Sequence, residues 1–153
     1  MKKVAVFLAL AFLVYACADN NSSNASDAPP PKSMVADEPA ADPKGIGEVR
    51  NVELNDPLNA EMVARGEGIY DMKCSACHKL TDQRVVGPGW KGITSKRTPE
   101  WIMNMTLNVD VMLEKDPAAQ ALLKECLVRM PNQNLSMQDA RDVLEFMLKN
   151  DGK

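Results

Sequence analysis

The chain of 153 residues is long enough for one domain of ordinary size with additional segments. Its formal net charge of −3 excludes the strongly basic surface that a nucleic-acid-binding protein uses to neutralise phosphates. Only 5% of the residues are aromatic and one is histidine, whereas 45% are apolar and ten are methionine. A core so poor in aromatic rings leaves room for a bound cofactor to supply part of its apolar volume.

Residues 1–17 have the pattern of an export signal. Two lysines precede thirteen apolar residues, 4–16, a run too short to span a bilayer. The end of this run resembles a lipoprotein signal, which implies that Cys17 becomes the acylated first residue of the mature protein. Cleavage after Ala18 is the alternative, because residues 16–18 also have the small-x-small form. We expect a lipid-anchored protein on the periplasmic side of a bacterial membrane, with a soluble periplasmic protein as the alternative.

Residues 18–56 have the composition of a disordered linker. They contain five prolines, a run of Asn and Ser, and eight acidic residues against three basic ones. Such a segment buries too little apolar surface to offset the entropy lost on ordering. We therefore expect an acidic tether that either lets the following domain reach its partners or only spaces it from the membrane.

The stretch from residue 57 to residue 153 shows no alternating strand pattern, so we expect one all-α domain. Helix starts are indicated where a capping residue precedes a proline or an acidic residue. These starts are Asp56-Pro57, for a helix to about Lys73 or Cys74, Thr98-Pro99-Glu100, Asp116-Pro117, for a helix to about Leu127, and Ser136-Met137-Gln138-Asp139. In the last helix Ala140, Val143, Leu144 and Met147 have the spacing of a buried stripe.

Residues 74–78 read Cys-Ser-Ala-Cys-His, the spacing at which two thiols form thioethers to haem while the next side chain reaches the iron. Cys74 and Cys77 are then the covalent attachments and His78 is the proximal ligand. A redox Cys-x-x-Cys pair would need a βαβ environment, which the helical pattern does not provide. A structural zinc site would need a fourth ligand, for which only Cys126 and carboxylates remain.

The sixth ligand of the iron cannot be a histidine of the same chain, because His78 is the only one. Met, Lys, water or no ligand remain. Met130 is the preferred candidate, since Pro131 and three polar residues follow it and place its thioether in a loop rather than on a helix face. Met112 is the only other methionine that we assign to a loop.

In these motifs the sequence resembles the class I cytochrome c family over almost all of residues 57–150. Residues 66–70, Gly-Glu-Gly-Ile-Tyr, resemble the N-terminal helix of that family, where Gly66 and an aromatic residue meet the C-terminal helix at Phe146. Residues 86–88, Val-Gly-Pro, resemble the loop whose proline carbonyl, here that of Pro88, accepts the Nδ1–H of the proximal histidine. Met130-Pro131 resembles the loop of the distal ligand.

The resemblance implies a cytochrome c fold, with about four to five helices wrapped around one covalently attached haem c. Trp90 stands where the family often has an aliphatic residue, and we expect it to pack against the haem rather than to bind a propionate. Trp101 is expected to belong to the core beside the haem. Cys126, left over after the two thioethers and one lipid, is expected to be a small buried apolar residue.

The resemblance also implies an electron carrier and not an enzyme, because a His/Met-ligated iron offers substrate no open position. A haem enzyme or gas sensor with an open sixth position is the alternative. We expect a monomer whose partners are redox proteins, with a quinol-oxidising complex or another cytochrome as donor and a terminal oxidase or reductase as acceptor. Residues 73–97 carry six basic side chains against one acidic side chain, which indicates either a basic rim that steers an acidic partner or an ordinary solvated surface.

Overall fold

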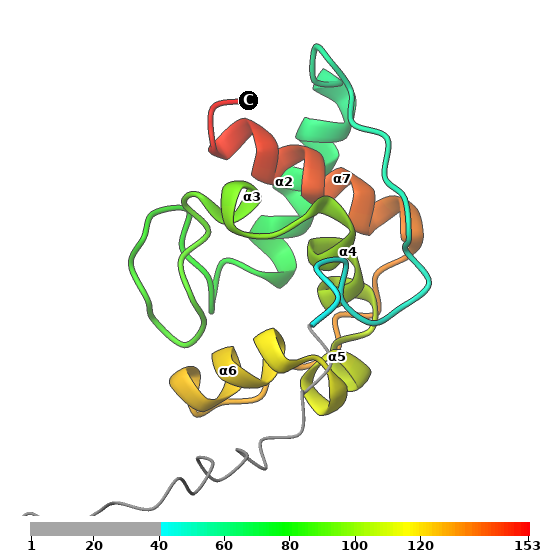
Figure 1. The fold of residues 1–153 in the computed structure, drawn as a ribbon. Helices are drawn as coiled ribbons and strands as arrows, with labels where there is room; N and C mark the ends of the chain where they lie inside the picture. The colour runs from blue at the N-terminus through cyan, green and yellow to red at the C-terminus, as the bar shows by residue number, and fades with distance from the viewer. Residues whose placement is uncertain (1–40) are drawn as a thin grey trace, which may run out of the picture. The chain divides into compact units, whose positions relative to one another are not determined.

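The computed structural model describes residues 41–153, in which helices are joined by irregular loops. Apart from an isolated bridge between His78 and Arg84, residues 41–153 form no strand, so the predicted all-α class is confirmed. The helices are α2 (Ala60–Lys73), α3 (Ile93–Lys96), α4 (Pro99–Leu107), α5 (Val109–Lys115), α6 (Pro117–Cys126) and α7 (Met137–Asn150), as Figure 1 shows. In this part of the chain no helix has both the length and the apolar character needed to cross a membrane. The predicted signal and lipidated Cys17 lie outside the described residues, as do residues 18–40 of the predicted linker.

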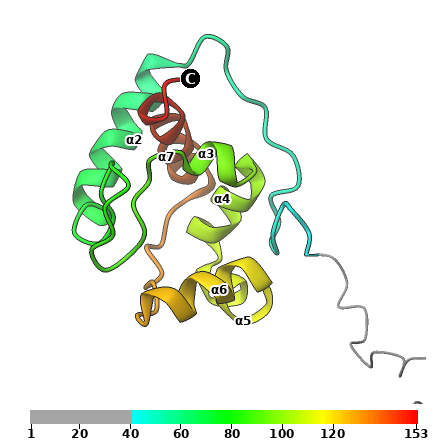
Figure 2. The same cartoon turned by 60° about the vertical axis from the view of Figure 1, so that its left-hand side comes forward.

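Helices α2 and α7 cross in close contact and form the main support of the domain (Figures 1 and 2). Gly66 makes this crossing possible, because a Cβ at that position would overlap the backbone carbonyl of Asp142 and lie 2.9 Å from Cβ of Phe146. Beside the crossing, the guanidinium of Arg65 donates to both carboxylate oxygens of Asp142, at 2.6 and 3.0 Å. The close contact expected at Gly66 is therefore present.

Three of the four predicted helix starts are confirmed. Thr98, Asp116 and Ser136 are the N-caps of α4, α6 and α7, and each side chain accepts a backbone N–H of the first turn. Ser136 and Asp139 form a reciprocal capping box. The buried stripe predicted along α7 is also confirmed, since all four of its residues are buried.

The start predicted at Asp56-Pro57 is wrong, because α2 begins only at Ala60. Its N-cap is Asn59, whose Oδ1 accepts the N–H groups of Glu61 and Met62, both at 3.0 Å. The N–H of Asn59 itself donates to the buried carboxylate of Glu145 in α7, at 2.8 Å. A contact with a residue far away in the sequence therefore fixes where this helix starts.

The prediction that the linker extends to residue 56 is also wrong. Residues 42–53, here called the N-terminal strap, lie against α4 and α5 with Gly45 and Val49 buried. The strap then continues along the outside of the domain to the start of α2 (Figures 1 and 2). Its composition is that of a linker, but its backbone groups find hydrogen-bond partners on α4. It is therefore part of the folded domain.

Candidate functional site

The turn that follows α2 brings the two motif cysteines and the histidine together. Cys74 is the C-cap of α2, and its carbonyl oxygen accepts the N–H groups of Cys77, at 3.1 Å, and His78, at 2.9 Å. These bonds form one further turn after the helix, so the side chains of Cys74, Cys77 and His78 all project from one short segment. Cys74 is buried, whereas Cys77 and His78 are partly exposed toward a pocket.

The orientation of the His78 ring is set by the loop that follows it. Its Nδ1 lies 2.8 Å from the carbonyl oxygen of Pro88, the contact that the family resemblance implies, so Nε2 is the nitrogen left to bind a metal. Gly87 lies against the ring, and a Cβ there would come within 2.7 Å of Nδ1. The Oη of Tyr70 donates to the carbonyl oxygen of His78, at 2.8 Å, which fixes the backbone of the histidine as well.

Burial shifts the protonation of this segment. It lowers the pKa of His78, an effect that the hydrogen bond to Pro88 only partly opposes, so the imidazole is neutral and able to bind a metal at neutral pH. Burial also raises the pKa of the Cys74 thiol to about 11. A reactive redox cysteine needs a lowered pKa, so this environment argues against a Cys-x-x-Cys redox pair.

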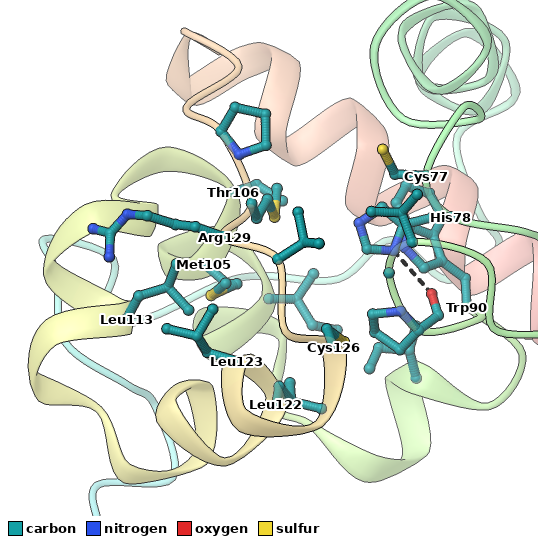
Figure 3. A pocket seen from close by; sticks show the side chains of 18 of the residues that line it. Cys77, His78, Trp90, Met105, Thr106, Leu113, Leu122, Leu123, Cys126 and Arg129 are labelled. Atoms are coloured by element: carbon teal, nitrogen blue, oxygen red, sulfur yellow. Dashed lines mark hydrogen bonds between the residues drawn. The ribbon is translucent and has the colours of Figure 1, made fainter.

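The pocket beside His78 is large and almost entirely apolar, and it encloses about 940 Å³ of space that no atom fills, part of it open to solvent. Figure 3 shows Cys77 and His78 on one side of it and residues of α6 on the other. It is lined by Cys77, His78, Val86, Gly87, Pro88, Trp90, Ile93, Trp101, Ile102, Met105, Thr106, Leu113, Leu122, Leu123, Cys126, Val128, Arg129, Met130, Pro131 and Met147. A pocket of this size and character fits a flat apolar cofactor.

Three methionines line this pocket, namely Met130, Met105 of α4 and Met147 of α7. Met112 does not line it. Met112 was expected in a loop but lies in α5 with an exposed fraction of 0%, and its sulfur accepts the N–H of Ile46 at 3.1 Å. Of the two methionines that we considered as sixth ligand, only Met130 is therefore in a position to face His78.

The two tryptophans both line the pocket but are held differently. The Trp90 ring packs between Tyr70 and His78, with centroid distances of 4.9 and 5.7 Å. The indole N–H of Trp101 donates to the buried carboxylate of Asp116, at 3.2 Å. Trp101 is therefore anchored by a polar contact to a residue that does not line the pocket.

Cys126 does not have the fully buried place that the sequence indicated. It is the last residue of α6, is partly exposed, and lines the pocket (Figure 3). The leucines of α6, Leu122 and Leu123, line the pocket too, and sequence reasoning did not assign them to the site. Their adjacent positions on an amphipathic helix mark an apolar face, but not the cavity that this face covers.

The structure offers no support for a zinc site, because within residues 41–153 no three His, Cys, Asp or Glu side chains cluster as metal ligands would. The residues present do fit haem c. Cys77 and a neutral His78 line one apolar cavity, Cys74 lies one turn before His78 in the same segment, and Gly87 lets the backbone approach the histidine ring closely.

Comparison with known proteins agrees with this site. The profile of the cytochrome c family matches residues 63–151, well over half of the chain. Cytochrome c from Rhodothermus marinus is 32% identical, with a TM-score of 0.68 over 72% of this chain and 97% of that chain. An engineered form of that cytochrome is 31% identical, with a TM-score of 0.69 over 73% of this chain and 100% of that chain.

The cytochrome c domain of the pp3183 protein from Pseudomonas putida is 26% identical, with a TM-score of 0.51 over 57% of this chain and 89% of that chain. A comparison with curated protein sequences gave no match. The expected cytochrome c fold is thus confirmed, and so is the expected cofactor, because the family carries covalently attached haem c. The chain belongs to the cytochrome c family and is a haem protein of electron transfer.

Proposed function

We propose that this protein is a membrane-tethered electron carrier in which His78 and Met130 would hold the haem iron. The observation that carries the proposal is that both side chains line the same apolar pocket, His78 from the loop after α2 and Met130 from the loop after α6. If both residues bound the iron, a substrate would have no route to the metal. The haem supplies one-electron chemistry when bound, as its iron changes between Fe(III) and Fe(II).

The protein's own residues prepare this site in three ways. The carbonyl oxygen of Pro88 accepts the hydrogen bond from Nδ1 of His78, which orients the ring and leaves Nε2 as the nitrogen that can bind the metal. The thioether of Met130 is a poor donor to Fe(III), so it favours the reduced state and a high potential. The apolar lining keeps water from the metal, which favours the reduced state further.

We propose that redox partners dock at the rim of this pocket. Four apolar side chains are exposed there or close by in sequence, namely Val85 and Val86 before the Pro88 turn and Leu127 and Val128 after α6. Val86 and Val128 also line the pocket. The basic character of residues 73–97 is partly neutralised, because Arg84 pairs with Glu125 at 2.6 Å. The rim therefore supports contact through apolar surface with a modest electrostatic contribution.

The tether is proposed from the sequence. Acylated Cys17 would hold the domain at the periplasmic side of a bacterial membrane, with residues 18–40 as the spacer. Mass spectrometry of the N-terminal peptide of the mature protein tests this directly. A peptide that begins with lipid-modified Cys17 supports the anchor, whereas an unmodified peptide that begins at Asp19 contradicts it and indicates a soluble periplasmic protein.

The ligand assignment is tested by Met130→Ala, with Met105→Ala as the matched control because Met105 lines the same pocket. The sulfur-to-iron charge-transfer band of the oxidised protein should disappear in Met130→Ala and remain in Met105→Ala. Loss of the band in Met105→Ala alone would assign the ligand to Met105.

Carbon monoxide titration of the unaltered reduced protein separates the carrier from the alternative of a haem enzyme or gas sensor. A carrier with both positions filled should bind the gas weakly and slowly. Rapid, tight binding would show an open sixth position and contradict the carrier proposal.

A further inference from the structure

We propose that the N-terminal strap, residues 42–53, is a positioning element of the haem pocket: it holds α4 in the place from which Trp101 forms the pocket wall, and thereby raises the reduction potential. The inference rests on the haem of this family and deepens the proposed carrier function, for which the potential decides the direction of electron flow. The strap lies before residues 63–151, which the family profile matches.

The strap is bonded to α4 chiefly through Asn104, whose side chain is buried with an exposed fraction of 1%. Its Nδ2 donates to the carbonyl oxygens of Lys44, at 2.9 Å, and Val49, at 3.0 Å, and its Oδ1 accepts the N–H of Val49, at 3.1 Å. Asn104 does not line the pocket, but Trp101 lies one helical turn before it and does. The contact between strap and helix is therefore transmitted to a pocket residue.

Two glycines allow the strap to lie this close. Gly45 has a φ of +69°, and a Cβ there would lie 2.8 Å from Cε of Met112 and 3.0 Å from Cδ1 of Trp101. At Gly47 a Cβ would overlap the amide oxygen of Asn104. The Trp101 ring thus has the strap at one edge and the pocket at another, so a displaced strap would leave it unsupported.

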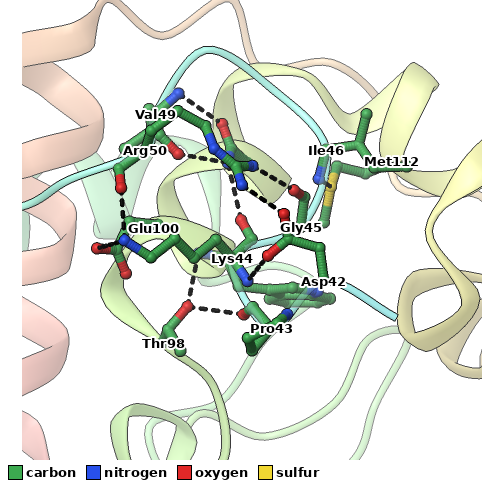
Figure 4. Close-up of polar contacts among 12 residues, drawn as sticks. Asp42, Pro43, Lys44, Gly45, Ile46, Val49, Arg50, Thr98, Glu100 and Met112 are labelled. Atoms are coloured by element: carbon green, nitrogen blue, oxygen red, sulfur yellow. Dashed lines mark hydrogen bonds and ion pairs between the residues drawn. The ribbon is translucent and has the colours of Figure 1, made fainter. Parts of the chain in front are cut away.

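Polar contacts within the strap, and between the strap and the start of α4, also hold it in place (Figure 4). Arg50 donates to the carbonyl oxygen of Gly45, at 2.9 Å, and pairs with Asp42. Lys44 pairs with Glu100 of α4, at 3.3 Å, and the hydroxyl of Thr98 donates to the carbonyl oxygen of Pro43, at 2.8 Å. These exposed contacts support the strap from its outer side, whereas the buried hydrogen bonds to Asn104 hold it against α4.

The effect on the haem has a definite sign. If the strap leaves, Met112 and one edge of Trp101 are exposed to water, and the buried amide of Asn104 loses its partners. Water near the pocket stabilises the more highly charged Fe(III) state relative to Fe(II), because charge is favoured in a medium of higher dielectric constant. Displacement of the strap therefore lowers the reduction potential.

The test compares the midpoint potentials of the full-length holoprotein and two uncharged strap variants. Gly47→Ala breaks the Asn104 contact, and Val49→Ala is a milder variant that keeps the backbone hydrogen bonds should Gly47→Ala fail to incorporate haem. Asn51→Ala is the matched control, because Asn51 is an exposed, uncharged strap residue. Trypsin cleavage after Lys44 or Arg50 reports in parallel whether the strap is displaced.

We expect faster cleavage and a lower midpoint potential in the strap variants, with both values unchanged in the control. Faster cleavage with an unchanged potential would overturn the proposal and reduce the strap to a stabilising segment. Unchanged cleavage in Gly47→Ala would overturn it too, because the close contact with Asn104 would then be absent. These comparisons hold for either coordination of the iron, whereas carbon monoxide binding by the unaltered protein tests the carrier function separately.

Discussion

Atom Nδ1 of His78 lies 2.8 Å from the carbonyl oxygen of Pro88. Gly87, the residue before Pro88, lies so close to the His78 ring that it leaves no room for a side chain. The proline carbonyl orients the ring, and the glycine lets the loop lie flat against it. As the proposed iron ligand, a ring fixed from two sides would need no rearrangement when the iron changes its oxidation state. The same arrangement makes the site sensitive to small changes in this loop.

Gly87→Ala should displace the His78 ring, because the new Cβ would come within 2.7 Å of Nδ1. We expect the weakened proximal bond to raise the share of high-spin haem in the absorption spectrum of the oxidised protein. Gly68→Ala is the matched control, since a Cβ at Gly68 meets no atom within 4 Å. Identical spectra for both variants and the unaltered protein would show that the loop tolerates a side chain at Gly87.

The same substitution should have opposite effects at two glycines of α2. Gly66→Ala should destabilise the protein by about 1–3 kcal/mol, because its Cβ overlaps the backbone of Asp142 and forces the helices apart. Gly68→Ala should stabilise it by about 0.5–1 kcal/mol, because alanine restricts the unfolded chain and fits the open helix surface. Urea unfolding measures both, and a stable Gly66→Ala protein would argue against the tight crossing of α2 and α7.

Two arginine ion pairs should differ in their contribution to stability. Arg65→Ala should be the more costly change, because it removes two hydrogen bonds to the buried carboxylate of Asp142. Arg84→Ala should cost less than about 1 kcal/mol, because Arg84 and Glu125 are both exposed and screened by water. The urea concentrations at the midpoints of unfolding compare the two losses, provided that the dependence of the unfolding free energy on urea is the same in both variants. Equal losses would mean that burial of Asp142 does not decide the effect.

Glu145 should make stability depend on pH. Its carboxylate is buried, which raises its pKa, but hydrogen bonds from Asn59, Asn55 and Arg141 outweigh this and lower the pKa below the ordinary value of 4.5. A lowered folded-state pKa means that the stabilisation is complete above the unfolded-state pKa and is lost as the pH falls through the folded-state value.

Glu145→Gln should therefore cost about 2 kcal/mol near neutral pH and much less in acid, where the unaltered protein has lost the same contribution. Urea unfolding of both proteins from neutral pH down to about pH 3 measures the difference. A gap between them that stays constant over this range would show that the ionised form of Glu145 is not what stabilises the fold.

The sequence by itself determined the features that depend on neighbouring residues. The Cys74 to His78 spacing indicated covalent haem, because one helical turn is enough to place the three side chains. Thr98, Asp116 and Ser136 marked three helix starts, because each side chain caps a backbone group three residues ahead. Such interactions are complete within a few residues, so they can be read without knowing the fold.

Only the tertiary structure decided the features that depend on distant partners. The strap has the composition of a linker and is ordered because Asn104, 55 residues beyond Val49, satisfies its backbone. Met112 is not a candidate haem ligand, because it packs against that strap and does not line the pocket. Cys126 lines the pocket because α6 ends there. Composition cannot show this, since a polar segment folds when buried partners elsewhere in the chain offset its ordering entropy.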